Sequence, residues 1–259
     1  MADGQTWRTA ISDVTADDIF IRGYSIQELM QRLTFTEVTY LTIRGALPRP
    51  SERDMLDAIL IALVDHQFVS SHVTAARFIV SGNPSVVAGL AGGVLTAGPY
   101  TLSPESAALF IDAAVARKQT LGSVADTARV VVAEMAERGE RIPGFGHVTH
   151  KVQDPRTVTL RKRAAELGCA GERVELYEAI HAEFVRRKGR ALPINADGMI
   201  AAILGDMGWC AAEMAGIAVV AAMPGLLAHV VEEIQQRVPH RFLPTEAITY
   251  TGPIGRQLP

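Results

Sequence analysis

The chain has few cysteines, few aromatic residues and almost no net charge, and each shortage excludes a class of protein. Its 259 residues contain two cysteines, Cys169 and Cys210, which stand at no metal-binding or redox spacing. We expect both to be small apolar fillers in a reducing cytoplasm. The formal net charge is only −3, so nothing favours nucleic acid or an anionic membrane surface as a partner.

Long hydrophobic runs are also lacking. The segment 211–231 comes nearest to a membrane span, but it carries Glu213, Pro224 and His229. Residues 1–13 contain no basic segment followed by an apolar one, so we expect no signal peptide. These absences predict a cytoplasmic protein with neither a membrane nor a nucleic-acid partner.

Helix-forming residues are abundant, chiefly alanine, leucine, glutamate and arginine. Before the helices begin, segments 8–12 and 19–21 alternate apolar and polar residues and predict a small β-hairpin. Ser25, with Glu28 three residues later, predicts a capping box at the first helix. Helical spacing then covers segments 29–43 (two short helices), 51–66, 70–80, 86–97, 105–117, 124–138, 157–167, 174–188, 195–207 and 213–237, with Pro224 at a break or a helix start. The sequence therefore predicts a mainly α protein with a small N-terminal β-hairpin.

The segment 143–147, Pro-Gly-Phe-Gly-His, concentrates features of a binding loop. Gly144 and Gly146 permit positive φ and a close approach of the backbone to a ligand. Backbone N–H groups in such a turn can hold a phosphate or a thioester oxygen. His147 can move protons near neutral pH, although a loop histidine is often a bystander. From the residues alone, a functional and a passive role both stay open.

Asp197 also has two interpretations. It can serve, like Asn195, as the N-cap of the helix that follows. Its neighbours Ile194, Met199 and Ile200 are apolar, however, and an apolar setting raises a carboxyl pKa and makes a better base at neutral pH.

Other polar residues are less specific. His66 stands in a polar stretch, 65–72, but no third ligand lies at a spacing that would hold a metal, so we predict none. His229 lies on an apolar helix, where a core histidine is more common than a catalytic one. Lys151 and Arg156 form either a solvated surface or a site for phosphate or carboxylate groups, which arginine binds with two hydrogen bonds.

Six segments resemble, in the same order, motifs of the citrate synthase superfamily. They are Arg22–Leu29, Tyr40–Pro48, Asp65–His72, Pro143–Arg156, Asn195–Asp197 and Gly225–Glu232. The compact chain is most similar to the citryl-CoA lyase branch, which includes the C-terminal module of ATP-citrate lyase. The resemblance implies a two-lobed helical fold, with a large domain of residues 1–104 and 213–259 and a small domain of residues 105–212.

The resemblance also implies a carbon–carbon lyase that cleaves citryl-CoA, or a related 3-hydroxyacyl-CoA, into acetyl-CoA and a keto acid such as oxaloacetate. It implies a homodimer with coenzyme A as part of the substrate and no tightly bound cofactor. The residues carried over are His66, His147 and Asp197 for catalysis, Arg156 and His229 for substrate binding, and Gly144, Phe145, Gly146 and Lys151 for coenzyme A.

The chain departs from the family pattern at several positions. Thr101 stands where citrate synthases have a catalytic histidine, and Leu102-Ser103 replaces a Gly-Gly pair. Val148 and Ala222 stand where the family has carboxylate-binding arginines. Each lost charge-assisted contact is worth about 1.5–3 kcal/mol. Two alternatives therefore stay open: a condensing enzyme that uses acetyl-CoA and a less charged keto acid, and a non-catalytic acyl-CoA-binding homologue.

Overall fold

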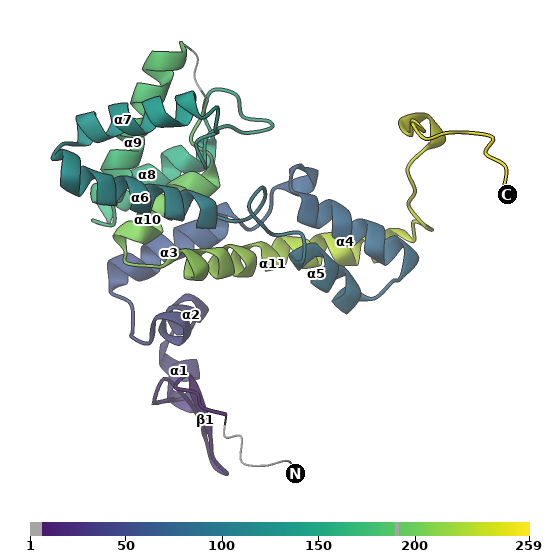
Figure 1. Ribbon diagram of the computed structural model, residues 1–259. Helices are drawn as coiled ribbons and strands as arrows, with labels where there is room; N and C mark the ends of the chain where they lie inside the picture. Colours follow the sequence, from purple (N-terminus) through teal and green to yellow (C-terminus); the bar gives the residue numbers. More distant parts are fainter. Residues whose placement is uncertain (1–6, 190–191) are drawn as a thin grey trace. The chain divides into compact units, whose positions relative to one another are not determined.

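The computed structural model describes residues 7–189 and 192–259, most of which are helical (Figure 1). The helices are α1 (Ile26–Arg32), α2 (Phe35–Arg44), α3 (Pro50–Ala62), α4 (Ser71–Gly82), α5 (Val86–Val94), α6 (Glu105–Leu121), α7 (Val124–Glu137), α8 (Pro155–Glu166), α9 (Glu172–Lys188), α10 (Ala196–Asp206) and α11 (Ala211–Gln236), with 3-10 turns at Gln67–Val69 and Thr245–Ala247. The predicted mainly α class is confirmed, and the helices lie within a few residues of their predicted positions.

The N-terminal sheet has three short antiparallel strands, β1 (Ser12–Val14), β2 (Ile19–Ile21) and β3 (Tyr24–Ser25), in that order. β1 begins at Ser12, so the first strand predicted over 8–12 was placed too early. The pairing sets this limit, because Ser12 lies opposite Ile21, where β2 ends. Beyond Ile21 the chain turns through Arg22 and Gly23 with positive φ and returns as β3.

The predicted capping box at Ser25 is wrong. The Ser25 hydroxyl donates to Asp18 Oδ2 at 2.6 Å, so it does not cap α1. A capping box forms instead at α2, where Thr34 N donates to Glu37 Oε2 at 2.7 Å and Glu37 N donates to Thr34 Oγ1 at 3.3 Å.

The chain divides into two compact units, which we describe separately. Unit 1 contains the described residues up to Asp65 together with Gly98–Ala222, and unit 2 contains His66–Ala97 and Met223–Pro259. The large and small domains expected from the sequence, 1–104 with 213–259 and 105–212, stay a prediction.

Unit 1 buries a large apolar core around α10. The α10 residues Ile200, Ile203 and Leu204 have no exposed surface, and they pack with residues of α3, α6 and α9. Fully burying a side chain of this size stabilises the fold by about 1.5–3 kcal/mol. The core therefore fixes the position of α10, whose first turn carries Asp197.

Unit 2 is built from α4, α5 and the second part of α11. Its core contains Ala76, Val80, Leu226 and Val230. Gly89 of α5 allows the close packing, since a Cβ there would lie 2.5 Å from Val80 Cγ1 and 2.9 Å from Val230 Cγ2.

α11 runs from Ala211 to Gln236 as one helix, so the break considered at Pro224 does not occur. Length and composition alone would allow α11 to cross a membrane. Such a helix is weak evidence, because core helices share these properties, and Ile217 and Leu226 of α11 belong to the cores of units 1 and 2.

Candidate active site

The loop 143–147 is bound along its length to the segment that leads into α10. Gly146 N donates to Pro193 O at 2.8 Å, and Asn195 N donates to Gly144 O at 2.9 Å. The Asn195 side chain adds a hydrogen bond from Nδ2 to Gly146 O at 3.1 Å, while its Oδ1 caps α10 through Gly198 N. The N-cap of α10 is therefore Asn195, which leaves the Asp197 carboxylate available for another role.

Gly144 lies directly against Gly198 in the first turn of α10. Gly144 has φ of +80°, and a Cβ there would lie 2.6 Å from the Gly198 Cα, closer than real side chains approach. Tyr177 of α9, which is fully buried, places its hydroxyl against both glycines and donates to Pro143 O at 2.7 Å. Only glycine fits at these two positions, because any side chain would displace the loop or the tyrosine.

Phe145 anchors the loop through the packing of its ring. Its ring packs against Tyr177, His181 and Phe184 with centroid distances of 5.1–5.5 Å. Its N–H donates to Ile142 O, as that of Gly146 does to Pro193 O. These two amides are thus used inside the protein, so a contact of the loop with coenzyme A has to come from other groups. The coenzyme A roles of Gly144, Phe145 and Gly146 stay predictions.

The His147 ring has a fixed tautomer in its neutral form. Its Nδ1 accepts hydrogen bonds from Thr149 N at 3.0 Å and His150 N at 2.9 Å. A nitrogen that accepts two N–H groups carries no proton, so the ring proton lies on Nε2. In this neutral form, the half-buried ring can donate a hydrogen bond only through Nε2–H.

Lys151 stabilises the turn that follows His147. Its Nζ donates to His147 O at 3.3 Å and to Val148 O, and the side chain is exposed. Lys151 therefore holds the turn closed, and its predicted contact with coenzyme A stays a prediction.

Arg156 and Asp154 form a two-point ion pair at the start of α8. Arg156 Nε donates to Asp154 Oδ1 at 3.0 Å, and its second terminal nitrogen donates to Oδ2 at 2.8 Å. Burial would raise the pKa of the completely buried Asp154, but the hydrogen bonds and charge of Arg156 outweigh it and hold that pKa below its usual value. When His147 is protonated, its charge acts in the same direction, so the loop histidine lies near this pair.

The pKa of Asp197 is raised, whereas that of Asp154 is lowered. Burial raises the pKa of its carboxyl from 3.8 to about 6, and the positive charge of Arg156 only partly opposes the effect. Asp154 adds a further upward contribution. The Asp197 side chain is half-buried, and within residues 7–189 and 192–259 no hydrogen bond to its carboxylate offsets the loss of solvent. Asp197 is thus a carboxyl group that gains and loses its proton close to neutral pH.

A cavity of about 610 Å³ opens beside this ion pair, between α8, α9 and the segment before α10. Asp154, Thr157, His181, Ile194 and Met199 are among the residues that line it. This volume is typical of small-molecule sites, and the walls combine apolar and polar groups.

Unit 1 thus brings together His147, Arg156 and Asp197, as well as the glycine loop. The other two predicted site residues, His66 and His229, lie in unit 2. His66 precedes the turn Gln67–Val69, and its side chain is half-buried. His229 Nδ1 lies 4.0 Å from Glu232 Oε2, and its ring packs on Phe68 at 5.7 Å.

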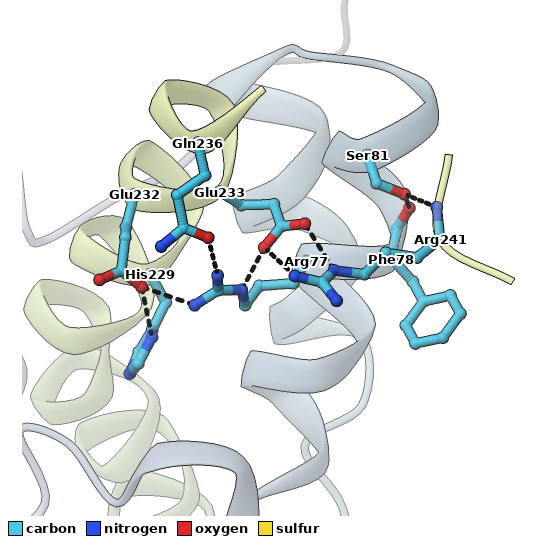
Figure 2. A network of polar contacts seen from close by, with 8 residues as sticks. All are labelled: Arg77, Phe78, Ser81, His229, Glu232, Glu233, Gln236 and Arg241. Atoms are coloured by element: carbon cyan, nitrogen blue, oxygen red, sulfur yellow. Dashed lines mark hydrogen bonds and ion pairs between the residues drawn. The ribbon is translucent and has the colours of Figure 1, made fainter. Parts of the chain in front are cut away.

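Unit 2 also contains a polar network that the sequence did not predict (Figure 2). Arg77 of α4, only 5% exposed, contacts Glu232, Glu233 and Gln236 of α11. Arg241 binds Glu233 from the other side, with one bond at 2.9 Å. Burial would raise the pKa of Glu233, yet the hydrogen bonds from Arg241 and Arg77 keep it below its usual value. A lone arginine within the apolar segment 73–80 was the one signal available in the sequence.

The model of the family described as "Citrate synthase, C-terminal domain" matches residues 1–55 and 48–242. The chain belongs to the citrate synthase family. Among curated members, it is 27% identical over 233 residues to "Putative citrate synthase 2" of Mycobacterium tuberculosis (strain H37Rv), with 88% of this chain and 59% of that protein aligned. "Citrate synthase 2" of Bacillus subtilis (strain 168) is also 27% identical, over 82% of this chain and 54% of its own length. The chain spans less than three fifths of the length of these curated relatives.

Solved structures from the citrate synthase family confirm the fold. Citryl-CoA lyase from Hydrogenobacter thermophilus superposes with a TM-score of 0.88 and 35% identity, over 98% of both chains. ATP citrate lyase from Methanothrix soehngenii, in complex with citrate and coenzyme A, superposes with a TM-score of 0.81 and 21% identity, over 99% of this chain and 44% of that one.

The positions that depart from the citrate synthase family pattern lie in three settings. Val148 is 75% exposed, whereas Ala222 is buried within α11. Leu102, which the resemblance places at a family glycine, has φ of +52°, and its side chain packs on the core of unit 1. Thr101 closes a tight turn through two hydrogen bonds with Gly98, each 3.0 Å long.

Proposed function

We propose that the protein is an acyl-CoA carbon–carbon lyase, which cleaves citryl-CoA or a related 3-hydroxyacyl-CoA into acetyl-CoA and a keto acid. The observation that carries the proposal is the half-buried Asp197, whose carboxyl pKa of about 6 suits a group that exchanges protons with carbon near neutral pH. The similarity to a citryl-CoA lyase over 98% of both chains supports this reaction.

The cleavage begins with removal of the proton from the substrate hydroxyl group. The electron pair left on the oxygen then forms the second bond of the keto C=O group, the bond to the carbon next to the thioester breaks, and its electron pair passes into the thioester enolate. Protonated Asp197 donates its proton to the enolate carbon and gives acetyl-CoA. The proton taken from the hydroxyl group restores the balance once it reaches the Asp197 carboxylate.

His147 contributes as a donor. Because its Nδ1 accepts two backbone N–H groups, Nε2–H is directed to the oxygen that becomes the keto group or to the adjacent carboxylate. That leaves His66 to take the hydroxyl proton. Arg156, held by Asp154, binds a carboxylate of the substrate, and His229 contacts the same end.

The test is to mix the purified protein with citryl-CoA and to follow loss of the thioester and formation of the keto acid. Asp197→Asn should abolish cleavage, whereas Asp17→Asn, at an exposed position in the N-terminal hairpin, should not change it. If the unaltered protein binds coenzyme A esters but turns over neither citryl-CoA nor acetyl-CoA with keto acids, the protein is a non-catalytic binding homologue and the lyase proposal fails.

A second function is favoured by Val148 and Ala222, which supply no positive charge where the family pattern has arginine. Condensation of acetyl-CoA with a keto acid less charged than oxaloacetate needs fewer such contacts. In that direction Asp197 acts as the base that removes the proton from acetyl-CoA. Turnover with a keto-acid panel but not with citryl-CoA would establish it. We further propose that the protein acts in the cytoplasm as a homodimer, without a metal.

A further inference from the structure

The Tyr177 side chain of α9 places its polar atom where the glycine loop meets the first turn of α10. Its hydroxyl donates to Pro143 O at 2.7 Å, and it occupies the space where a Cβ of Gly144 or of Gly198 would stand. The ring is fully buried and packs on Phe145 at a centroid distance of 5.3 Å. The hydroxyl therefore fixes the distance between the loop and the first turn of α10.

This distance determines the geometry of the proposed reaction. Asp197 directly precedes Gly198, and His147 follows Gly144 by three residues. The hydrogen bonds between residues 144–146 and residues 193–195 join the loop to the segment that leads into α10. They do not by themselves fix how closely Gly144 approaches Gly198, because no hydrogen bond joins these two glycines in the described residues. The Tyr177 hydroxyl supplies that constraint.

We propose that Tyr177 is a positioning residue, which holds His147 and Asp197 at their working separation by pinning Pro143–Gly144 against Gly198. The proposal rests on the proposed function for its catalytic consequence. Tyr177 itself does not transfer the proton, because its hydroxyl is committed to Pro143 O and burial and the Asp197 charge raise its pKa well above the usual value. Small displacements of reacting groups have large effects on rate, of order 100-fold for about 1 Å.

The test compares Tyr177→Phe with Tyr40→Phe. Tyr40 is a matched control, because it is also a buried tyrosine of the unit 1 core, 6% exposed, but it packs on Trp209 at a centroid distance of 5.6 Å. Removing only the hydroxyl keeps both rings in place, so both variants should fold. Two readouts are measured on each: amide hydrogen exchange of the full chain, and kcat and KM with citryl-CoA.

We expect Tyr177→Phe to speed exchange at the amides of Gly146 and Asn195, which bond to Pro193 O and Gly144 O. We also expect kcat to fall about 10- to 100-fold, with KM changed less than about threefold, because alignment rather than binding is lost. Tyr40→Phe should leave the exchange of both amides and kcat unchanged.

Unchanged exchange at Gly146 and Asn195 in Tyr177→Phe would overturn the proposal, as would faster exchange with an unaltered kcat. Equal loosening in Tyr40→Phe would show general softening of the core and would also overturn it. If the unaltered protein has no turnover with any substrate, the proposed function fails, and hydrogen exchange still decides whether Tyr177 positions the loop.

Discussion

Glu233 of unit 2, which is buried, and Asp197 of unit 1, which is half-buried, are two carboxylates with opposite surroundings. Glu233 is 1% exposed and accepts hydrogen bonds from the guanidinium groups of Arg77 and Arg241 (Figure 2). Asp197 has no such partner among the described residues, and Arg156, whose charge acts on it, is already paired with Asp154. Consequently the pKa of Glu233 is lowered, and that of Asp197 is raised to about 6.

This difference distinguishes a carboxylate that stabilises the structure from one that can exchange a proton. Two guanidinium groups compensate the burial of Glu233, so its charge joins α4, α11 and the C-terminal segment permanently. The loss of solvent around Asp197 is only partly compensated, by the charge of Arg156, so Asp197 changes its charge near pH 6. A destabilising arrangement that persists in a well-packed unit is expected where a protein performs chemistry.

The largest expected effect is on activity. Asp197→Asn keeps the shape of the side chain but removes the exchangeable proton, so kcat with citryl-CoA should fall about 100- to 10,000-fold. Glu233→Gln, which alters the other carboxylate, should retain kcat in the protein that remains folded. Initial rates at pH 7, normalised to the folded fraction, measure both. Similar losses of kcat in the two variants would remove the distinction between them.

The next effect is on stability. Glu233→Gln removes the shared carboxylate from the buried Arg77 guanidinium and from the partly exposed Arg241 guanidinium, and should lower the free energy of unfolding by about 3–5 kcal/mol. Glu232→Gln is the matched control on the same helix: its side chain is 54% exposed, so it should cost less than about 1 kcal/mol. Urea unfolding at pH 7 measures both. A loss below 1 kcal/mol for Glu233→Gln would contradict the structural role.

The third prediction is that a substitution of Asp197 stabilises the protein, whereas the substitution of Glu233 destabilises it. The folded-state pKa of Asp197 exceeds its usual 3.8, so its contribution to stability is complete below pH 3.8 and is lost as pH rises to about 6. Two units correspond to at most about 3 kcal/mol. Asp197→Asn should therefore stabilise the protein at pH 7 by up to that amount and flatten this part of the profile. Urea unfolding between pH 4 and pH 8 measures it, and destabilisation at pH 7 would disprove the uncompensated charge.

The smallest expected effect is a shift in the pH dependence of the reaction when Arg156 is replaced. Its positive charge lowers the pKa of Asp197, so Arg156→Gln should raise that pKa further. The midpoint of the pH dependence of kcat/KM for cleavage should then move upward, by less than about one unit. Arg161→Gln, which removes an arginine paired with Glu178 on the outer part of α8, should leave the midpoint in place. An unchanged midpoint in Arg156→Gln would mean that Asp197 does not control the profile.

Much of this arrangement was predictable, since helical spacing locates the helices and the motif residues identify His147, Arg156 and Asp197. Local hydrogen-bond competition was not, because the Ser25 hydroxyl had both Asp18 and the α1 backbone within reach and the tertiary partner prevailed. Nothing in the sequence pointed to Tyr177, and the lone Arg77 in an apolar segment did not reveal its partners in the Glu233 network. Tyr177 lies 34 residues from Pro143, and Arg77 lies 155 and 156 residues from its two glutamates. Pattern reasoning cannot pair such positions without the fold.

Leu102 has a positive φ, a backbone conformation that glycine adopts more easily than leucine. Its φ of +52° is a conformation that costs about 1–2 kcal/mol for a residue with a Cβ. The leucine side chain packs on the core of unit 1, which offsets part of this strain. A glycine at this position would let the turn flex, whereas Leu102 anchors it. We therefore expect the turn formed by Gly98–Leu102 to move less than a turn with glycine at this position would.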